Sequence, residues 1–532
     1  MQPDPFDNEQ TLLAHQERGA LEAFHTAYDD AIATVESRLG ASHPLRIDGE
    51  RVGTDDQFTV TSPADTDCEI GTFAAATADD VDDAVGAAAA AFDGWRARDP
   101  SARVAIFRRA AERMRDRKFE LAATLTIENG KTRPEAMADV DEAIDFLRFY
   151  SRELERNDGY QYDTGEPTPG QHCSNGLEPI GVFGVIGPFN FPCAIFTGMV
   201  AGAVLTGNAV VAKPASATPL IAHTVVEVLS AAGVPDGVLN LVTGSGRAVG
   251  TPLVEHDAVD GVAFTGSKAV GDRIRRTFLD LGKRGPVIAE LGGKNSVIVT
   301  DAADVDEAVS GVANGAFGYS GQKCSATSRV YVDEDVVETF ARELVSAAED
   351  LPIRRPRDAQ AFVSPLIDDD ALERYRDVCD TARREGRILT GGAVVSSPEL
   401  SAGRFVEPTV VRGIPHDHDL AREEQFLPFV TIHPVAGLEE AVTKANDSTY
   451  GLCAGLFSED PDEVDTWLRR IESGMCYVNR ARSATTGALV QAQPFGGWKA
   501  SGTTGKFAGG YWYLPQFMRE QSRTIVGDLE RA

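Results

Sequence analysis

One of the seven cysteines in the chain, Cys324, lies in a polar, glycine-containing stretch, Phe317-Gly-Tyr-Ser-Gly-Gln-Lys-Cys-Ser325. A thiol with Lys323 and other polar neighbours forms a thiolate more easily than a thiol in an apolar core. The alternative is a small buried hydrophobic side chain, which is the usual role of a free cysteine. This segment alone supports a nucleophile and a structural thiol about equally, so groups elsewhere in the chain must decide.

Two other side chains have the chemistry that such a nucleophile needs. Glu290, in Glu290-Leu-Gly-Gly-Lys-Asn295, ends an apolar strand, where apolar surroundings would raise its pKa and suit it to act as a general base. Asn190, in Pro188-Phe-Asn-Phe-Pro192, lies in a turn fixed by two prolines, where its amide could donate to a developing oxyanion. Taken alone, however, Glu290 favours a helix cap or a turn acceptor.

A third segment could bind a phosphate group. Gly266-Ser-Lys-Ala-Val-Gly271 follows a predicted strand and should open a helix, so its N–H groups and Ser267 could meet an anion. This pattern is weak on its own. The spacing of His416-Asp-His418 suggests a metal site, but no third ligand motif accompanies it, and no metal is expected.

The elements that must position these residues change in character along the chain. Apolar residues at helical spacing predict helices over residues 10–40 and 78–156. From residue 177 onward, short β-branched runs alternate with helical stretches, which predicts βαβ units on a parallel sheet. A second such series is predicted to begin at Pro286-Val-Ile-Ala-Glu290 and to continue through 296–300 and 329–332. The fold class is therefore α/β, with two large domains.

Composition restricts the setting of this chemistry. A chain of 532 residues with 42% hydrophobic residues is long enough for two large domains with ample cores. Its net charge of −30 comes from 81 acidic and 51 basic residues, and only ten of the basic residues are Lys. Acidity with few Lys indicates a salt-rich cytoplasm, whereas an acidic mesophilic protein is the less favoured explanation.

Several classes of function are disfavoured by the same data. The acidic field would repel nucleic acid and anionic membranes. The cysteines are odd in number and scattered without a CxxC pair, which favours reduced thiols over disulfides or zinc. The chain does not begin with a secretory signal, and the apolar stretch 194–212 is broken by Gly, Thr and Asn, which predicts a buried helix and turn. A cytoplasmic location is expected.

The candidate residues and their spacing resemble those of the aldehyde dehydrogenase superfamily. The resemblance spans about residues 40–505. Its motifs vary in specificity one by one, but their order and spacing together are very specific. The motifs are Pro188-Phe-Asn-Phe-Pro192, Lys213-Pro-Ala-Ser216, Phe264-Thr-Gly-Ser-Lys-Ala-Val-Gly271, Glu290-Leu-Gly-Gly-Lys294, Gly321-Gln-Lys-Cys324 and Pro494-Phe-Gly-Gly497.

This resemblance implies a mechanism in which Cys324 is the nucleophile, Glu290 the base and Asn190 the oxyanion donor. Cys324 would attack an aldehyde carbon, and Asn190 and the Cys324 backbone N–H would stabilise the oxyanion. Hydride would pass to a nicotinamide, and Glu290 would then activate water to hydrolyse the thioester to a carboxylic acid. Because Glu290 is present, a CoA-acylating member of the family, which lacks this base, is disfavoured.

The resemblance also implies a dinucleotide site. Lys213 matches the ligand of the adenosine ribose, and Glu424 matches the glutamate that holds the nicotinamide ribose, although Leu427 replaces the usual Gly nearby. Ser216 stands where many NAD-specific relatives have a Glu that repels a 2′-phosphate, so NAD is expected and NADP is possible. The expected cofactor-binding residues are Ile186, Pro188, Lys213, Ser216, Gly246, Gly250, Gly266, Ser267, Gly271, Glu424 and Phe426.

A division into domains follows from the same resemblance. Residues 1–155 and 176–289 are expected to form a Rossmann-like NAD(P)-binding domain with N-terminal helices, and residues 290–505 an α/β catalytic domain. Residues 156–175 and 506–532 are expected to form a small β-hairpin and tail for oligomerisation, with the aromatic run Tyr511-Trp-Tyr513 packing on a neighbour. A homo-oligomer is therefore expected. An ordinary surface loop and tail is the alternative.

Within the superfamily, the segments 28–49, 142–146, 213–216 and 321–329 resemble the Δ1-pyrroline-5-carboxylate (L-glutamate γ-semialdehyde) dehydrogenases of proline degradation. In that subfamily, the Ser after the nucleophile and a Gly-rich loop bind the substrate carboxylate. The Ser325 hydroxyl and two loop N–H groups would form an uncharged site that binds an anion. The alternative is that Ser325 caps a helix and that residues 486–488 form a plain turn. The expected substrate-binding residues are Phe189, Ser325, Gly487 and Ala488.

Other functions stay open at this level. The expected substrate is a small aldehyde with a carboxylate, and 2-oxoglutarate semialdehyde or succinate semialdehyde would want the same anion site. A catalytically silent protein of the same fold is the alternative from another class. The presence of Cys324, Glu290, Asn190 and Lys213 together argues against it.

Overall fold

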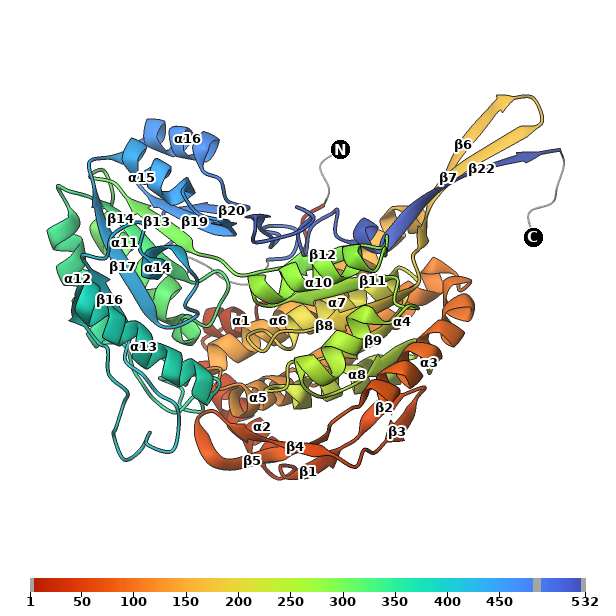
Figure 1. Cartoon of the computed structure of the whole chain (residues 1–532), viewed down its shortest axis with the longest axis horizontal. Coiled ribbons are helices and arrows are strands. Elements are labelled where there is room, and N and C mark those ends of the chain that lie inside the picture. The colour runs from red at the N-terminus through yellow and green to blue at the C-terminus, as the bar shows by residue number, and fades with distance from the viewer. Residues whose placement is uncertain (1–3, 482–488, 528–532) are drawn as a thin grey trace.

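The computed structural model describes residues 4–481 and 489–527. Two seven-stranded sheets organise the molecule, and each lies in its own α/β lobe (Figure 1). A three-stranded sheet projects away from the lobe of the first sheet (Figure 1). The α/β class predicted from the sequence is confirmed.

The first sheet has the order β12-β11-β8-β9-β10-β2-β3. Its five central and outer strands from β12 to β10 are parallel, and β2 and β3 add an antiparallel edge. The chain moves from β8 to β9 and β10 on one side and then returns to β11 on the other, so the strand order reverses at β8. Its strands are β2 (Leu45–Ile47), β3 (Glu50–Val52), β8 (Val182–Ile186), β9 (Ala209–Lys213), β10 (Leu239–Leu241), β11 (Gly261–Thr265) and β12 (Val287–Glu290).

The position of β12 corrects one sequence prediction. Residues 286–290 were expected to begin the second series of strands, but β12 pairs in parallel with β11 in the first sheet, with Thr265 opposite Glu290. Only four residues separate β12 from β13 (Asn295–Val299). A parallel neighbour in the same sheet needs a crossover of a dozen or so residues, so the short turn must lead into the other sheet.

The second sheet has the order β15-β16-β17-β14-β13-β19-β20, and it is parallel except for the edge strand β15. Helices α11, α12, α15 and α16 lie in its lobe (Figure 1). Its strands and the helices of this half are β13 (Asn295–Val299), β14 (Thr327–Asp333), β15 (Arg387–Thr390), β16 (Thr409–Arg412), β17 (Phe429–Val435), β19 (Cys453–Phe457), β20 (Met475–Val478), α11 (Val305–Phe317), α12 (Val337–Glu349), α13 (Asp369–Glu385), α14 (Asp419–Arg422), α15 (Leu438–Asn446) and α16 (Pro461–Arg470).

The predicted N-terminal helices are present, divided at polar caps. Thr77 and Asp80 form a reciprocal capping box at the start of α3, and Asp99 caps α4 with Pro100 in the first helical position. The Asp99 cap separates α3 from α4 where sequence periodicity alone shows a continuous run. The helices are α1 (Thr11–Glu17), α2 (Leu21–Glu36), α3 (Ala78–Arg96), α4 (Pro100–Asp116), α5 (Lys118–Glu128) and α6 (Arg133–Arg156).

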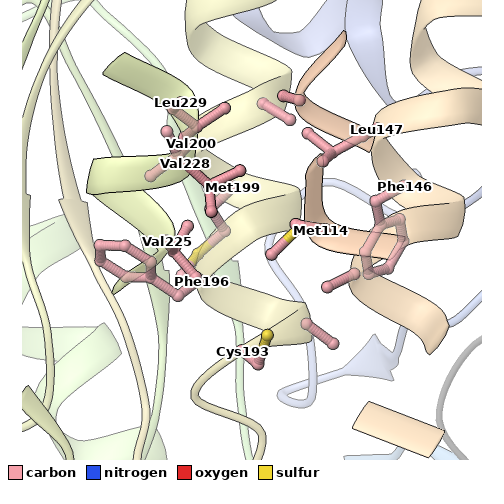
Figure 2. Close-up of a cluster of buried hydrophobic side chains, with 14 of the residues drawn as sticks. Met114, Phe146, Leu147, Cys193, Phe196, Met199, Val200, Val225, Val228 and Leu229 are labelled. Atoms are coloured by element: carbon pink, nitrogen blue, oxygen red, sulfur yellow. The ribbon is translucent and has the colours of Figure 1, made fainter. Parts of the chain in front are cut away.

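The largest hydrophobic core surrounds α7 (Ala194–Leu205), the helix predicted for the apolar stretch after residue 194. Figure 2 shows Met199 and Val200 of α7 among side chains of α4, α6 and α8, such as Met114, Phe146 and Val225. The side chains of α7 are almost all apolar, and they are buried on every side of the helix. A helix that is packed between layers has this pattern. The other helices of this half are α8 (Pro219–Ala232), α9 (Thr251–Glu255) and α10 (Lys268–Asp280).

The segment predicted as a hairpin or flap forms a β-hairpin, and the C-terminal tail pairs with it along β7. The outer strands β6 and β22 are exposed along almost their whole length. The aromatic tail differs from the expectation in part. Tyr513 stacks on Tyr150 of this chain's own α6 at 5.1 Å, whereas Trp512 is 70% exposed. The strands are β6 (Gln161–Thr168), β7 (Gln171–Pro179) and β22 (Met518–Val526).

Short elements complete the fold. A three-stranded sheet, in the order β1-β5-β4, packs beside α5, and a two-stranded pair, β18 with β21, lies close to the turn after β12. Among the described helices, none is both long and apolar enough to span a bilayer. The remaining elements are β1 (Ala41–His43), β4 (Gln57–Ser62), β5 (Asp65–Ala74), β18 (Tyr450–Gly451), β21 (Trp498–Lys499) and the short helices η1 (Asp158–Tyr160), η2 (Gly246–Gly250), η3 (Gly318–Gly321) and η4 (Leu514–Phe517).

Candidate active site

A cavity between the two sheets brings together Cys324, Glu290 and Ser325, residues far apart in the sequence. About 600 Å³ of space, part of it open to solvent, lies between its walls. Glu290 reaches it from the carboxyl end of β12, and Cys324 from the turn before β14. Its other walls come from α6, α7 and the C-terminal region, namely Glu142, Phe146, Phe191, Ile195, Gly198, Met199, Thr265, Phe495, Ala508 and Tyr513.

The turn that carries Cys324 has an unusual backbone. Tyr319, Ser320 and Gly321 follow one another with φ of 52°, 53° and 65°, all in the left-handed region. Two of them are not glycine, so the surrounding structure must impose this conformation. At Gly321 a Cβ atom would lie 2.1 Å from the backbone oxygen of Leu427, which leaves room for glycine alone.

Asn295, at the start of β13, fixes the backbone around the nucleophile. Its amide nitrogen donates to the carbonyl oxygens of Cys324 at 2.7 Å and Ala326 at 2.9 Å. Its amide oxygen accepts from the backbone N–H of Cys453 at 3.0 Å. One buried side chain therefore ties the Cys324 turn to the central strands of the second sheet.

The thiol itself is held in the neutral form. Burial, together with the charges of Glu424 and Glu290, raises the pKa of Cys324, while the N–H groups of Ser325 and Cys324 act in the opposite direction. Lys323 does not supply the cationic neighbour expected from the sequence, because it forms an ion pair with Glu135 of α6 at 2.6 Å. The prediction that the local sequence favours a thiolate is therefore wrong for this state of the protein.

Glu290 has the apolar surroundings expected of a general base. Burial raises its pKa well above the ordinary value, and a hydrogen bond from the backbone of Gly497 opposes that shift. Its Oε2 atom has no hydrogen-bond partner among the described residues. A carboxyl group with a free oxygen in a cavity can receive a proton from a molecule bound there.

The Asn190 turn lies next to the cavity. Asn190 is buried at 4% exposure, and its neighbour Phe191 lines the cavity, but Asn190 is not among the described lining residues. Phe189, expected to contact substrate, packs edge-on against Phe426 with ring centroids 5.7 Å apart. Pro188 lies in the same turn, two residues after the end of β8 at Ile186.

A second cavity brings together four of the expected cofactor residues, Ile186, Lys213, Gly246 and Gly250. Ile186 and Lys213 end the adjacent parallel strands β8 and β9, at the edge where ligands of such sheets bind. Burial lowers the pKa of Lys213 to about 8. The apolar walls of this cavity include Val254 of α9 and Val270 and Ile274 of α10. Such walls suit the flat base of a nucleotide, and the Lys213 amine beside them could donate to ribose hydroxyls.

The glycine-rich segment opens α10 as predicted, with Ser267 immediately before the first helical residue and its side chain exposed. Gly266 donates its N–H to the carbonyl of Glu290 at 3.2 Å, which links this segment to the other cavity. Gly271 has a packing reason to be glycine, because a Cβ atom there would lie 2.4 Å from the side chain of Leu291. Ser216 is exposed and donates to the carbonyl of Gly244 at 2.9 Å.

Glu424 lies in the turn after α14 and faces the Gly292-Gly293 backbone. It accepts from the N–H of Gly293 at 3.0 Å, and a Cβ atom on Gly292 would meet its carboxylate at 2.1 Å. Burial raises the pKa of Glu424 to about 7. Phe426, two residues on, has a φ of 59°. The Glu424 carboxylate lies near enough to Cys324 for its charge to raise the pKa of the thiol, in addition to the effect of burial. A group that holds the nicotinamide end of a dinucleotide would have to lie this near to the thiol.

Sequence reasoning missed several residues of the site. Lys294 is buried beside Glu424, donates to Gln425, and has a pKa lowered to about 7 by burial. Glu142 and Phe146 line the first cavity, and the resemblance of segment 142–146 was the one available signal for them. Tyr513 reaches the cavity from the tail, which no local pattern indicates. Gly487 and Ala488 lie outside the described residues.

The described residues contain no group of three or more His, Cys, Asp and Glu side chains arranged to hold a metal ion. His416 contacts Tyr331 and Asp447, and His418 caps α14. All seven cysteines are free thiols.

Comparisons with known proteins agree with this geometry. Residues 51–522 match the sequence profile of the aldehyde dehydrogenase family. A 1-pyrroline-5-carboxylate dehydrogenase of Bacillus pumilus (strain SAFR-032) is 39% identical over 504 residues, covering 94% of this chain and 95% of that protein. The 1-pyrroline-5-carboxylate dehydrogenase 2 of Bacillus subtilis (strain 168) is 38% identical over 527 residues, covering 98% of each chain.

Solved structures resemble the whole chain. A 1-pyrroline-5-carboxylate dehydrogenase from Thermus with bound NAD has a TM-score of 0.91 at 35% identity, covering 99% of this chain and 100% of that one. A betaine aldehyde dehydrogenase from Staphylococcus aureus in complex with NAD+ has a TM-score of 0.87 at 28% identity, covering 95% of this chain and 98% of the other. Because the family profile covers residues 51–522 and the two Bacillus relatives are 38–39% identical over nearly the whole chain, the chain belongs to the aldehyde dehydrogenase family.

Proposed function

We propose that this enzyme oxidises L-glutamate γ-semialdehyde, the open form of Δ1-pyrroline-5-carboxylate, to L-glutamate with NAD, as a step of proline degradation. One observation carries the proposal: Cys324 and Glu290 open onto one cavity, and Ser325 and Glu142 lie in its wall. The names of relatives that cover nearly the whole chain support the same substrate.

In the first half of the reaction, Cys324 loses its proton and its Sγ atom attacks the aldehyde carbon. The backbone N–H of Cys324 and the Asn190 amide donate to the resulting oxyanion. When bound, NAD supplies the hydride acceptor. Loss of hydride from the tetrahedral carbon leaves the substrate as a thioester on Cys324.

In the second half, Glu290 takes a proton from water, and the resulting hydroxide attacks the thioester carbon. The C–S bond breaks, the carboxylic acid leaves, and the thiolate of Cys324 is regenerated. The free Oε2 atom of Glu290 in the cavity supports this role. Its raised pKa means that the hydrolytic half requires a pH at which this carboxyl group is ionised.

The cavity wall supports an amino-acid aldehyde in particular. Phe146, Met199 and Phe495 give it apolar surfaces that suit the two methylene groups of the substrate. Glu142 adds a carboxylate that can attract an ammonium group, and the hydroxyl of Ser325 can donate to a carboxylate. Succinate semialdehyde and 2-oxoglutarate semialdehyde have no ammonium, so Glu142 favours the glutamate derivative.

We propose NAD as the main cofactor, with NADP accepted less well. Lys213, Ile186, Gly246 and Gly250 would hold the adenosine half, and Glu424 would hold the ribose next to the nicotinamide. Ser216 carries no charge to repel a 2′-phosphate, but its hydroxyl is directed to the carbonyl of Gly244.

We also propose that the enzyme is a cytoplasmic homo-oligomer adapted to high salt. The exposed strands β6 and β22 leave backbone groups at both edges of the projecting sheet, and such edges pair readily with another chain. The net charge of −30 and the scarcity of Lys support a salt-rich environment.

The test is NADH formation in molar salt from Δ1-pyrroline-5-carboxylate, 2-oxoglutarate semialdehyde and succinate semialdehyde, each with NAD and with NADP. The proposal expects the highest kcat/KM for Δ1-pyrroline-5-carboxylate with NAD. A higher kcat/KM for an aldehyde without an amino group would overturn the substrate. Cys324→Ala should remove the activity, whereas Cys476→Ala, a free thiol of β20, should keep it.

A further inference from the structure

Asn129, the residue that follows α5, connects the two turns that carry the reacting groups. It is fully buried. Its amide nitrogen donates to the carbonyl oxygen of Phe189 at 2.6 Å, and its amide oxygen accepts from the hydroxyl of Tyr319 at 2.7 Å. Phe189 adjoins Asn190, and Tyr319 begins the left-handed run that leads to Cys324.

These two turns belong to different halves of the molecule. The Asn190 turn follows β8 of the first sheet, whereas the Cys324 turn lies between α11 and β14 of the second. Within residues 4–481 and 489–527, no strand pairing joins the two seven-stranded sheets directly. The separation between the oxyanion donor and the nucleophile therefore depends on contacts that cross from one half to the other.

Other side chains of residues 129–139, which we name the junction segment, support the same arrangement. The Lys131 ammonium lies 3.5 Å from the centroid of the Phe191 ring and 5.2 Å from that of Tyr319. Lys131 also pairs with Asp139 at 2.9 Å, and Asp139 accepts from the N–H of Ala194 at 2.7 Å. The junction segment thus holds the Asn190 turn from both ends.

Glu135 of the junction segment reaches the other turn. Its ion pair with Lys323 lies next to Cys324 in the chain. The hydroxyl of Tyr319 lies also 3.2 Å from the carbonyl oxygen of Asn129, so it contacts that residue twice. Both turns are therefore fixed against one short stretch of the first half.

We propose that Asn129 is a positioning residue for the reaction: it sets the separation between the oxyanion donor Asn190 and the nucleophile Cys324. The inference rests on the proposed function, which assigns those two roles. Asn129 does not line the cavity, so it acts through the backbone of Phe189 and the hydroxyl of Tyr319. A displacement of about 1 Å between reacting groups can lower a rate on the order of a hundredfold.

The type of side chain matters because one end must donate and the other must accept. Asparagine does both, whereas aspartate keeps the acceptor for Tyr319 and loses the donor to Phe189. Two variants therefore break the connection from opposite sides. Asn129→Asp removes the contact to the Asn190 turn, and Tyr319→Phe removes the contact to the Cys324 turn.

Tyr28→Phe is the matched control. The Tyr28 hydroxyl is as buried as that of Tyr319 and bonds to Ala122 and Thr126 at 3.0 and 2.7 Å, but it contacts neither turn. Removal of either tyrosine hydroxyl should lower the midpoint of unfolding by a similar amount. A purely structural effect would appear equally in both variants.

The experiment measures three quantities for each full-length variant in molar salt: the pre-steady-state rate of NADH formation, the rate of alkylation of Cys324 by iodoacetamide, and the midpoint of unfolding. Alkylation needs the thiol but no oxyanion donor, so it reports whether Cys324 itself is intact. We expect Asn129→Asp and Tyr319→Phe each to slow NADH formation by about tenfold or more, with alkylation within about twofold of the wild type. The double variant should be little slower than either single one.

The idea is overturned if both variants form NADH as fast as Tyr28→Phe does, or if NADH formation and alkylation fall together with the folded fraction. It is also overturned if the two effects are fully additive, because the residues then act independently. A failure of the proposed function would look different. In that case, wild-type protein would form no NADH from Δ1-pyrroline-5-carboxylate, or Cys324→Ala would form it at the wild-type rate.

Discussion

The Glu290 carboxyl group and the Cys324 thiol line one cavity, and charge on Glu290 raises the pKa of the thiol. Ionising both groups together is therefore costly, although the proposed mechanism uses each of them in the ionised form. A sequence of two half-reactions avoids this cost, because the thiol is masked as a thioester when the carboxylate acts on water. The coupling between these two charges therefore favours a mechanism in which attack by Cys324 and hydrolysis by Glu290 occur one after the other.

Glu290→Gln should separate the two halves experimentally. Cys324 keeps its attack on the aldehyde, but the thioester has no base to activate water, so it accumulates. We expect a burst approaching one NADH per active site, followed by a steady-state rate lowered by about 10² to 10⁴. Stopped-flow absorbance measures the burst, and mass spectrometry of quenched protein detects the acyl group on Cys324.

The pH dependence of the wild type gives a second view of Glu290. Because its pKa is raised, the carboxyl group is protonated and inactive as a base at lower pH, so steady-state turnover should increase as pH rises through that pKa. Glu290→Gln should lack this increase. Loss of the burst itself in Glu290→Gln would show that the residue acts before hydride transfer and not in hydrolysis.

Glu142→Gln should change substrate preference. A charge-assisted hydrogen bond to the substrate ammonium contributes about 1.5 to 3 kcal/mol, so kcat/KM for Δ1-pyrroline-5-carboxylate should fall by about 10- to 100-fold. The value for succinate semialdehyde, which lacks the ammonium, should stay within about twofold. Initial rates with both aldehydes measure the ratio. Equal losses for both would place Glu142 in general cavity structure and not in recognition of the amino group.

Gly321→Ala should damage the Cys324 turn. A methyl group at this position meets the backbone oxygen of Leu427 at 2.1 Å, and a φ of 65° is already unfavourable for alanine. Because backbone must shift at the nucleophile, we expect kcat to fall by about a hundredfold. Gly94→Ala is the control, since its Cβ has open space and the residue lies in α3. Similar kcat values for the two variants would contradict the prediction.

Local sequence patterns were sufficient to predict the fold class, and they marked Cys324, Glu290 and Asn190 as candidates for the reacting groups. Helical periodicity, β-branched runs and the position of Glu290 at a strand end each depend on neighbours in the chain, and the structure has them as expected. The error at β12 came from assigning β12 and β13, which follow one another in the sequence, to the same sheet. The four residues between β12 and β13 were too few for a crossover, so connection length contained the correct answer.

Long-range pairing explains what the sequence could not predict. Lys323 looked like a cation that would favour the Cys324 thiolate, but it pairs with Glu135, which is 188 positions away in the chain. Asn129 belongs to none of the motifs, and Lys294 lies in a motif that gave no sign of its partners, so the roles of both depend on residues brought near by the fold. Buried polar groups must find partners, yet a single sequence does not say which partners they find.

Glu128→Gln should change how stability depends on pH. Glu128 is buried and accepts from the N–H groups of Leu220 and Ile221 at the start of α8, and burial raises its pKa from 4.5 to about 8. The folded protein therefore keeps a proton that the unfolded chain releases between these values. This contribution to stability is fully present below about pH 4.5 and is lost as pH rises through about 8.

A glutamine at position 128 stays neutral, so the free energy of unfolding should fall less steeply between pH 5 and 8, by up to about 1.4 kcal/mol per pH unit. Urea titrations at several pH values measure the difference in slope. Glu227→Gln, at a half-exposed residue of α8, serves as the control. Parallel pH profiles for wild type and Glu128→Gln would mean that the carboxyl group is ionised in the folded protein.

Salt should stabilise the folded protein. With 81 acidic and 51 basic residues, the folded chain brings like charges together, and salt at molar concentration reduces the range of their repulsion to about 3 Å. The same salt weakens surface ion pairs, but each of these contributes only about 0 to 1 kcal/mol, so relief of the net repulsion should prevail. We expect the Tm to rise by several degrees, about 5 °C or more, between 0.1 and 2 M KCl. Sucrose at equal osmolarity is the control, since it is excluded from the surface without screening charge. An equal rise in sucrose would show that solute exclusion, and not charge screening, stabilises the protein.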